Sequence, residues 1–278
     1  MNRRELDPTS SPLAALAVQL RRLREAKGLT QVEFGRLVRY SNVYISNVET
    51  GKQAPSLKFA LRADAVLEAN GSLELLWWSW KNSALIPGFA EYAPKEREAI
   101  AVRLFETDMV PGLLQHPEYA AAYESAPVRR GEATEAEAED RLRLLAARQG
   151  LLVRAPAIHV VLDEGVLRRP IGGPQVMIKQ LTHLEELAQR PNLILQVAPF
   201  TLAEDRPLSH SVTLLTLPNR TMVGYTESLH RGYLERDADT VAGWAGKYDR
   251  LQVDALNRAD SLAMIREARK ELMSCRWT

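Results

Sequence analysis

The stretch LRRLREAKGLTQVEFGRLVRYSNVYISNVETGKQAPS, residues 20–56, decides the fold of the N-terminal part of the chain. Leucines at spacings of three and four predict a first helix, which Gly28 ends. Thr30 and Glu33 have the spacing of a capping box, which predicts the start of a second short helix. Ser41 is suited to cap a third helix, and a fourth follows Pro55. The pattern therefore predicts short helices joined by tight turns.

The second and third helices need a small residue where they cross, and Gly35 meets that need. It costs about 1 kcal/mol of helix propensity relative to alanine. Ile45 and Val48 are expected to face inward and fix the third helix. The outward face then holds short amides and a hydroxyl beside one apolar side chain, a set suited to base edges and a thymine methyl: Asn42, Val43, Ser46 and Asn47.

Several of these positions resemble the helix-turn-helix of the Xre/phage-repressor family: Gly28, Thr30–Gln31, Gly35, Glu49–Thr50–Gly51–Lys52 and Pro55. The resemblance covers roughly residues 13–67. It implies a five-helix DNA-binding domain over 13–82, with the third helix in the major groove of double-stranded DNA. It implies base contacts by the four outward residues and phosphate contacts by Gln31, Arg36, Arg39, Tyr44 and Lys52. Arg24 and Glu49 resemble the family's structural ion pair.

One position departs from that family. The turn after the second helix commonly holds glycine, whereas this chain has Arg39. A residue other than glycine with a positive φ costs about 1 kcal/mol. Two alternatives follow from the residue itself: Arg39 reaches a phosphate, or the turn is of another type.

Positive charge is concentrated in the same region. The 278-residue chain has a formal net charge of only +1, yet residues 20–62 hold nine Lys or Arg against three acidic residues. Residues 81–278 carry a small negative excess. Phosphate binding requires such a local positive potential.

The segments on either side are less distinctive. Residues 1–12 are expected to form a flexible arm. Three tryptophans, Trp77, Trp78 and Trp80, fall in a fifth helix and predict either an inter-domain or dimer contact or plain core packing. Residues 83–155 are interpreted as a helical connector, including a helix over about 95–108.

After Pro156 the pattern changes to alternating strands and one amphipathic helix. AIHVVLDE, NLILQVAPF, HSVTLLTLP and MVGYTES are strand-like, and residues 176–189 are helical. A helical tail follows from Thr240. Residues 156–278 are therefore predicted to form an α/β sandwich, and the whole chain an α+β multidomain protein.

The C-terminal phrases VPGLLQHPEYA and VVLDEGVLRRPIGGPQVMIKQLTHLEELAQRPNLILQVAPF, with the closing helices, resemble the sensor domain of WhiJ-like (Scr-type, antitoxin-like) Xre regulators. That resemblance implies binding of a small partner protein encoded nearby or of a small-molecule effector. Open α/β sheets bind ligands at the carboxyl ends of their strands. The candidates near those ends are Asp163, Glu164, Arg168, Phe200 and Glu227.

The sequence contains no motif that is typical of catalysis or of metal binding. The five histidines are scattered, without HExxH, and no G-x-S-x-G, P-loop or dinucleotide fingerprint occurs. We therefore expect no catalytic residue, no metal, no cofactor and no enzyme activity. The single cysteine, Cys275, is expected to be a passive thiol. With no signal peptide or apolar span of about 20 residues, a cytoplasmic protein without membrane contact is expected.

These observations predict a DNA-binding transcriptional regulator that acts as a homodimer on two half-sites. Two alternatives stay open. One is an antitoxin-like interaction protein that chiefly sequesters a partner, with autoregulatory DNA binding. The other is an enzyme with a DNA-targeting module.

Overall fold

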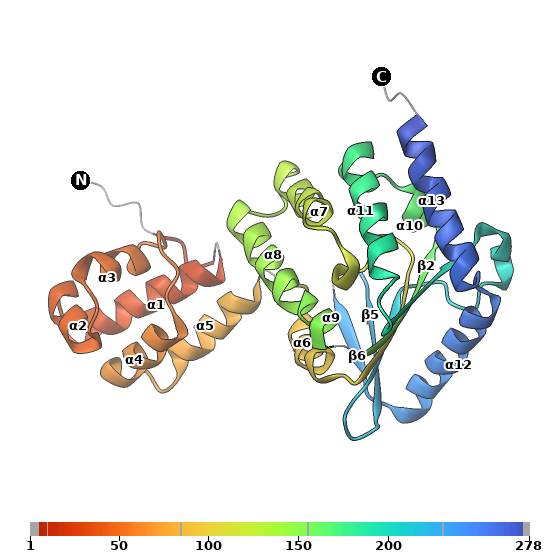
Figure 1. Ribbon diagram of the computed structural model, residues 1–278. Helices are drawn as coiled ribbons and strands as arrows, with labels where there is room; N and C mark the ends of the chain where they lie inside the picture. Colours follow the sequence, from red (N-terminus) through yellow and green to blue (C-terminus); the bar gives the residue numbers. More distant parts are fainter. Residues whose placement is uncertain (1–5, 10, 84, 155, 230, 275–278) are drawn as a thin grey trace. The chain divides into compact units, whose positions relative to one another are not determined.

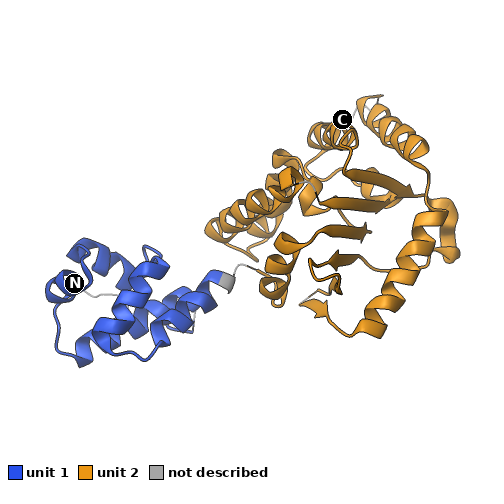
Figure 2. Cartoon of the chain, turned by 60° about the horizontal axis from the view of Figure 1, so that its bottom comes forward, with its two compact units in different colours: residues 1–84 blue, residues 85–278 orange. Residues whose placement is uncertain are grey.

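The structure is a computed structural model that describes residues 6–9, 11–83, 85–154, 156–229 and 231–274. The chain divides into two compact units, residues 1–84 and residues 85–278 (Figure 2). Part of the expected arm (residues 1–5 and 10), one of the five histidines (His230) and the single cysteine (Cys275) lie outside the described residues.

The first unit is all-helical (Figure 1). Each of its first four helices begins after a serine or threonine whose side chain accepts a hydrogen bond from the first turn, and Thr30 and Glu33 form the expected capping box. Phe34, Ile45 and Phe59 are among the residues that form the buried core. The helices are α1 (Pro12–Ala26), α2 (Gln31–Val38), α3 (Asn42–Glu49), α4 (Leu57–Leu67) and α5 (Ser72–Ser83).

The turn between α2 and α3 is tight. A Cβ on Gly35 would lie 2.7 Å from the carbonyl oxygen of Tyr40, so no side chain fits there. Arg39 ends α2 with φ 61° and ψ 46°, which is the left-handed conformation. The turn therefore keeps the geometry that favours glycine, and the alternative of another turn type is wrong.

The tryptophans of α5 differ in their surroundings. The Trp77 indole Nε1 donates to the carbonyl oxygen of Pro55 at 2.8 Å, and its ring packs against the core of the first unit. Trp78 meets Trp77 edge-on at 4.9 Å but leaves 45% of its surface exposed. Core packing thus accounts for Trp77, while Trp78 and Leu75 form an exposed apolar patch on α5.

The second unit is built on one six-stranded mixed sheet in the order β3-β2-β1-β4-β5-β6. The strands are β1 (Ala101–Glu106), β2 (Ala157–Asp163), β3 (Leu193–Ala198), β4 (Val212–Thr216), β5 (Met222–Glu227) and β6 (Gly232–Glu235). The α-helices are α6 (Phe89–Glu98), α7 (Pro117–Arg129), α8 (Glu135–Gln149), α9 (Leu151–Arg154), α10 (Glu164–Arg168), α11 (Pro174–Leu187), α12 (Ala238–Asp254) and α13 (Arg258–Ser274). Two 3₁₀ helices, η1 (Gly112–Leu114) and η2 (Phe200–Asp205), complete it.

Strand direction places several strand ends at one edge of the sheet. β1, β2 and β3 are parallel, β4 is antiparallel to β1, and β5 is antiparallel to β4. β5 therefore runs in the same direction as β1. The carboxyl ends of β1, β2, β3 and β5 consequently share an edge, where α/β sheets commonly bind ligands.

Helices cover both faces of this sheet. On one face Val102 and Leu104 of β1 join a core that includes residues of α6, η1, α7, α11 and α13. On the other face Phe105 and Val161 pack with Tyr248 and Leu251 of α12. Figure 1 shows α12 on this side of the sheet, where Leu202 of η2 also packs against the core. The fold is thus the α+β multidomain arrangement expected.

The prediction of a helical connector over residues 83–155 is wrong in the middle of that range. α6 ends at Glu98, and the segment interpreted as the end of a helix over 95–108 is β1, which lies inside the sheet. Both faces of this strand are covered, so its side chains lack the one-sided apolar pattern of a surface strand. The boundary between units falls at 84/85, and residues 85–155 belong to the second unit. β6 was not expected from the sequence either.

Candidate DNA interface and C-terminal cavity

The third helix presents a short polar surface. Asn42 and Val43 are exposed, with Val43 at 62%, whereas Ser46 and Asn47 are half-buried. The opposite side is anchored by Ile45 and Val48, which are both fully buried. The Ser41 hydroxyl accepts from the Tyr44 backbone N–H at 3.1 Å and fixes the start of α3. The four outward residues therefore form one contiguous face of a rigidly held helix.

A buried ion pair connects α1 to the end of α3. Arg24 Nε lies 2.5 Å from Glu49 Oε1, and Arg24 Nη2 lies 3.0 Å from Glu49 Oε2. Hydrogen bonding to Glu49 is the main cause that raises the pKa of the Arg24 guanidinium. Gln31 Nε2 donates to Glu49 Oε2 at 2.8 Å, so the first residue of α2 is held by the same carboxylate. This network fixes the orientation of α1, α2 and α3 together.

The other predicted phosphate-contacting residues differ in how they are held. Arg36, Arg39 and Lys52 are exposed, and no ion pair within the described ranges includes them. Tyr44 is half-buried, stacks on Tyr40 at 4.7 Å, and its hydroxyl accepts from the Ser56 N–H at 3.3 Å. The three cations are thus available to an anion, whereas Tyr44 also helps to pack the start of α4.

Four of the five C-terminal candidates gather where β2 and β3 end. Asp163 Oδ1 accepts from the Gly165 N–H at 2.8 Å, and its second oxygen pairs with Arg206. Glu164 accepts from the Phe200 N–H at 3.0 Å and lies 3.2 Å from Arg168 Nη2. Arg168 also pairs with Glu271 of α13, and Phe200 is 57% exposed. Their polar groups therefore bond mainly within the protein and hold α10 in place.

Glu227 lies elsewhere. β1 and β4 separate β5 from β2, so Glu227 and Asp163 are three strands apart, or about 14 Å at the usual strand spacing. The structure does not bring the five candidates together. Glu227 instead lines a cavity of about 640 Å³ that contains none of the other four.

The floor and walls of this cavity come from elements distant in the sequence. Glu106 at the end of β1, Thr213 of β4 and Tyr225 and Glu227 of β5 form its floor. The walls come from α6, α7, α8 and the segment after β1. Their lining side chains include Phe89, Tyr92, Asp108, Met109, Tyr123, Glu124, Glu132, Arg141, Leu144, Leu145 and Arg148.

One wall is fixed by a buried ion pair. Arg148 Nε and Nη2 donate to the two carboxylate oxygens of Glu96 at 2.7 and 2.8 Å. The Tyr92 hydroxyl donates to Glu96 at 2.6 Å, and the guanidinium lies 4.8 Å from the centre of the Phe89 ring. Burial raises the pKa of Tyr92 well above its ordinary value. The positive charge of Arg148 is therefore already neutralised by Glu96.

Among the acids that line the cavity, Glu106 has a carboxyl group with a shifted pKa. Burial raises the pKa of its carboxyl to about 7, and the nearby charges of Glu227 and Asp108 add to the increase. A hydrogen bond from Ser211 and the charge of Arg148 act in the opposite direction. Glu227 accepts from the Tyr225 hydroxyl at 2.7 Å. A carboxyl group poised near neutral pH in a concave site is typical of functional positions.

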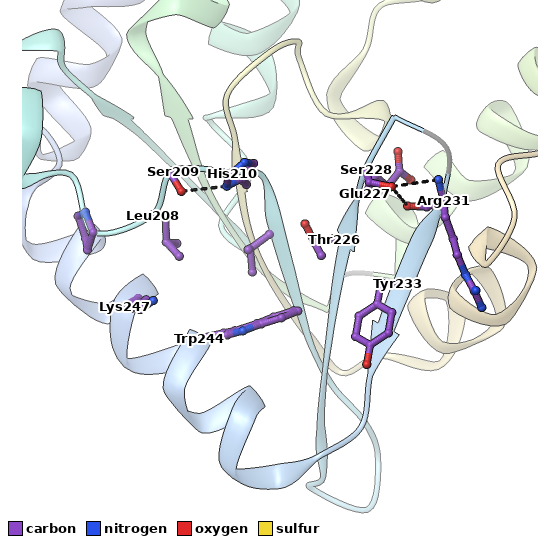
Figure 3. A pocket seen from close by; sticks show the side chains of 12 residues that line it. Leu208, Ser209, His210, Thr226, Glu227, Ser228, Arg231, Tyr233, Trp244 and Lys247 are labelled. Carbon is purple, nitrogen blue, oxygen red and sulfur yellow. Dashed lines mark hydrogen bonds between the residues drawn. The ribbon is translucent and has the colours of Figure 1, made fainter.

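A second, smaller cavity of about 490 Å³ adjoins the first through His210, Val212, Thr226 and Glu227. Figure 3 shows Thr226 between Trp244 of α12 and Tyr233 of β6, with Lys247 farther along α12. A Cβ on Gly224 would lie 2.6 Å from Trp244, so this glycine allows the indole to rest on the strand.

The sequence pattern does not point to Glu106, the acid that distinguishes the larger cavity, because it predicts a helix over about 95–108. The signal in AVRLFE is weak, because apolar residues that include one β-branched residue precede the acid without regular alternation. Arg148 carries no local signal of its role, because its pairing with Glu96, 52 positions away, depends on the tertiary fold.

Within the described ranges, none of the helices has the length and hydropathy of a membrane-spanning segment. Within the same ranges, no group of three or more His, Cys, Asp or Glu side chains is arranged to hold a metal ion.

Comparison with known protein families assigns both units. Residues 15–77 match a helix-turn-helix domain, which covers most of the first unit. Residues 89–267 match a domain of unknown function, DUF5753. No curated protein matches the chain, and no solved structure matches it. Because the second match spans more than half of the chain, this protein belongs to the family defined by the domain of unknown function DUF5753, which it carries behind a helix-turn-helix domain.

Proposed function

We propose that this protein is a sequence-specific transcriptional regulator of the Xre type, and that its second unit binds an effector without catalysing a reaction. The observation that carries the first part is the exposed polar face of α3 inside a helix-turn-helix domain. The cavity at the strand ends supports the second part.

The DNA-binding step follows from the geometry of the first unit. Asn42, Val43, Ser46 and Asn47 would reach base edges in the major groove, where amides bind adenine and an apolar group contacts a thymine methyl. Arg36, Arg39 and Lys52 would neutralise phosphates and release counterions, which supplies affinity for any sequence. The Arg24–Glu49 pair would keep the reading helix in register with the phosphate contacts.

A single helix-turn-helix reads only a few base pairs, so we propose a homodimer on two half-sites. The exposed patch formed by Leu75 and Trp78 on α5 is a candidate contact. The second unit is larger than dimerisation requires, which supports a sensing role.

The larger cavity is the best-supported effector site. Its volume of about 640 Å³ lies in the usual range for small-molecule sites, and its lining combines aromatic side chains with charged and polar groups. An effector that prefers one arrangement of two DNA-binding units would change operator affinity by its differential binding free energy, typically about 1–3 kcal/mol. A small partner protein, as the WhiJ-like resemblance implies, would act by the same linkage.

The test is selection of bound sequences from random DNA by the full chain, followed by titration of the selected site at several salt concentrations. We expect an enriched motif with two-fold symmetry and a salt-dependent affinity. Failure to enrich any motif would overturn sequence-specific regulation. A site without symmetry, bound by a monomer in light scattering, would overturn the homodimer.

A further inference from the structure

The acids that line the larger cavity fall into two groups. Three of them pair with arginines: Glu124 lies 2.5 Å from Arg141, Glu132 lies 2.6 Å from Arg130, and Asp108 lies 3.8 Å from Arg169. The other two are Glu106 and Glu227. Within the described part of the chain, neither of these two carboxylates forms an ion pair with a lysine or an arginine.

The lining arginines do not balance those two charges. Arg148 is held in two hydrogen bonds by Glu96, and Arg141 is held by Glu124. Both arginines that line the cavity are therefore engaged by other acids and, among the residues that the structure describes, do not pair with Glu106 or Glu227. The positions of these two acids differ, because Glu106 is partly buried at the end of β1 and Glu227 is exposed at the end of β5.

Much of the rest of the lining is apolar or aromatic. Tyr92 and Tyr225 stack at 4.1 Å, and Phe89 meets Tyr225 edge-on at 6.2 Å. Tyr123, Met109, Leu144 and Leu145 also line the cavity. Aromatic faces attract cations, and the effect increases when the cation is desolvated.

We propose that this cavity binds an amphipathic organic cation, with its ammonium group between Glu106 and Glu227 and its apolar body against the aromatic wall. The inference rests on the proposed effector role of the second unit and specifies the chemistry of the effector. An anion would meet two carboxylates, and the two lining arginines are already paired with acids. A neutral apolar ligand would desolvate Glu106 without compensating its charge.

The pH dependence of binding follows from the groups that face Glu106. They are Glu227 on β5, Asp108 after β1, Ser211 before β4 and Arg148 on α8, and His210 lines the same cavity. Because an alkylammonium stays protonated through neutral pH, its affinity should increase as Glu106 ionises near pH 7. Binding of a cation would in turn lower the pKa of the Glu106 carboxyl.

The experiment uses three probes of similar shape with the full chain: 4-phenylbutylamine, 4-phenylbutan-1-ol and 5-phenylpentanoate. Isothermal titration calorimetry measures their affinities at pH 6 and pH 8. We expect the amine to bind at least about tenfold more tightly than the alcohol, the carboxylate to bind weakest, and the preference for the amine to increase with pH.

Two variants and a matched control locate the site. Glu106→Gln and Glu227→Gln should each reduce the affinity for the amine by about tenfold, and Glu106→Gln should remove most of its pH dependence. Glu204→Gln removes an exposed acid on η2 that lines neither cavity, and it should leave the affinity unchanged. Equal affinities for amine and alcohol, tighter binding of the carboxylate, or full affinity in both cavity variants would overturn the proposal.

Binding to DNA distinguishes this proposal from the regulatory function. The selected operator should be bound by Glu106→Gln as tightly as by the natural chain when no amine is present. If operator binding is intact and the amine does not bind at millimolar concentration, the cation proposal fails while DNA binding stands. If the amine binds and operator affinity does not change, the site stands and the effector role fails.

Discussion

Arg24 and Glu49, which are 25 positions apart, form a two-pronged ion pair that is almost completely withdrawn from solvent. The two residues are 6% and 4% exposed, and Arg24 Nη1 also donates to the carbonyl oxygen of Leu29 at 2.6 Å. Because Glu49 is the last residue of α3, the pair sets where this helix ends relative to α1.

Glu49→Ala should destabilise the first unit by about 3–5 kcal/mol, because it leaves a buried guanidinium without its carboxylate. Urea denaturation followed by fluorescence of the tryptophans of α5 measures the loss. The matched control is Glu25→Ala, since the exposed Glu25 also contacts Arg24, at 3.3 Å. Its cost should be below about 1 kcal/mol. Similar losses for the two variants would contradict the structural role of the buried pair.

Gly35→Ala should destabilise the first unit by about 1–3 kcal/mol, although alanine favours helices. The added Cβ would lie 2.7 Å from the Tyr40 carbonyl oxygen, so the turn between α2 and α3 must move. Gly243→Ala is the control, because that glycine lies in α12 with nothing within 4 Å of an added Cβ. It should stabilise its helix by about 0.5–1 kcal/mol. Both effects are measurable by calorimetry, and a stabilising Gly35→Ala would contradict the tight turn.

The Arg39→Asn variant tests two properties of this residue, its strained backbone conformation and its positive charge. Asparagine tolerates the left-handed conformation better than arginine, so the variant should gain up to about 1 kcal/mol in stability. It also removes a cation from the proposed DNA surface, so affinity should fall and the salt slope should become flatter by about one unit. A more stable variant with unchanged salt slope would show that Arg39 contacts no phosphate.

Asn47→Ala and Lys52→Ala should have different effects on DNA binding. Loss of Asn47 should cost about 1–3 kcal/mol on the selected site and much less on random DNA. Loss of Lys52 should weaken binding to both by a similar factor and reduce the salt slope by about one. Fluorescence anisotropy on the two DNAs at several salt concentrations checks both. An equal loss on both DNAs for Asn47→Ala would exclude it from base reading.

The first unit was largely predictable because its signals are local. Caps such as Thr30 and Ser41, the glycine at 35 and short apolar spacings each act within one or two turns of helix, and the structure has helices at those places. The conformation of Arg39 was not predictable. Its left-handed turn is imposed by the packing of α2 against α3, against the preference of the residue itself.

In the second unit, the sequence predicted only the strands whose apolar segments are clearly separated from the neighbouring helices. β2 and β3 are apolar runs that one polar residue each interrupts, His159 and Gln196, and the sequence pattern identified them. β1 follows a helix after only two residues and carries Arg103, whose charge is paired with Asp249 of α12 at 2.6 Å. That long-range pair removes the usual cost of a cation inside a sheet, and no local pattern reports it. Missing β1 also meant missing Glu106 and the cavity it lines.

The stability of the second unit should depend on pH through Glu106. The pKa of this carboxyl is raised from 4.5 to about 7 in the folded protein, so the folded state binds more protons than the unfolded state between those values. Stability should therefore decrease as pH rises through that window, and the loss should be complete above about pH 7. Glu106→Gln removes the ionisation and should melt at a higher temperature than the natural chain at pH 8, with a smaller difference at pH 5. Calorimetry of the second unit's transition in the full chain measures this, with Glu204→Gln expected to follow the natural chain. Parallel pH profiles for Glu106→Gln and the natural chain would show that Glu106 ionises in the folded protein as it does in the unfolded one.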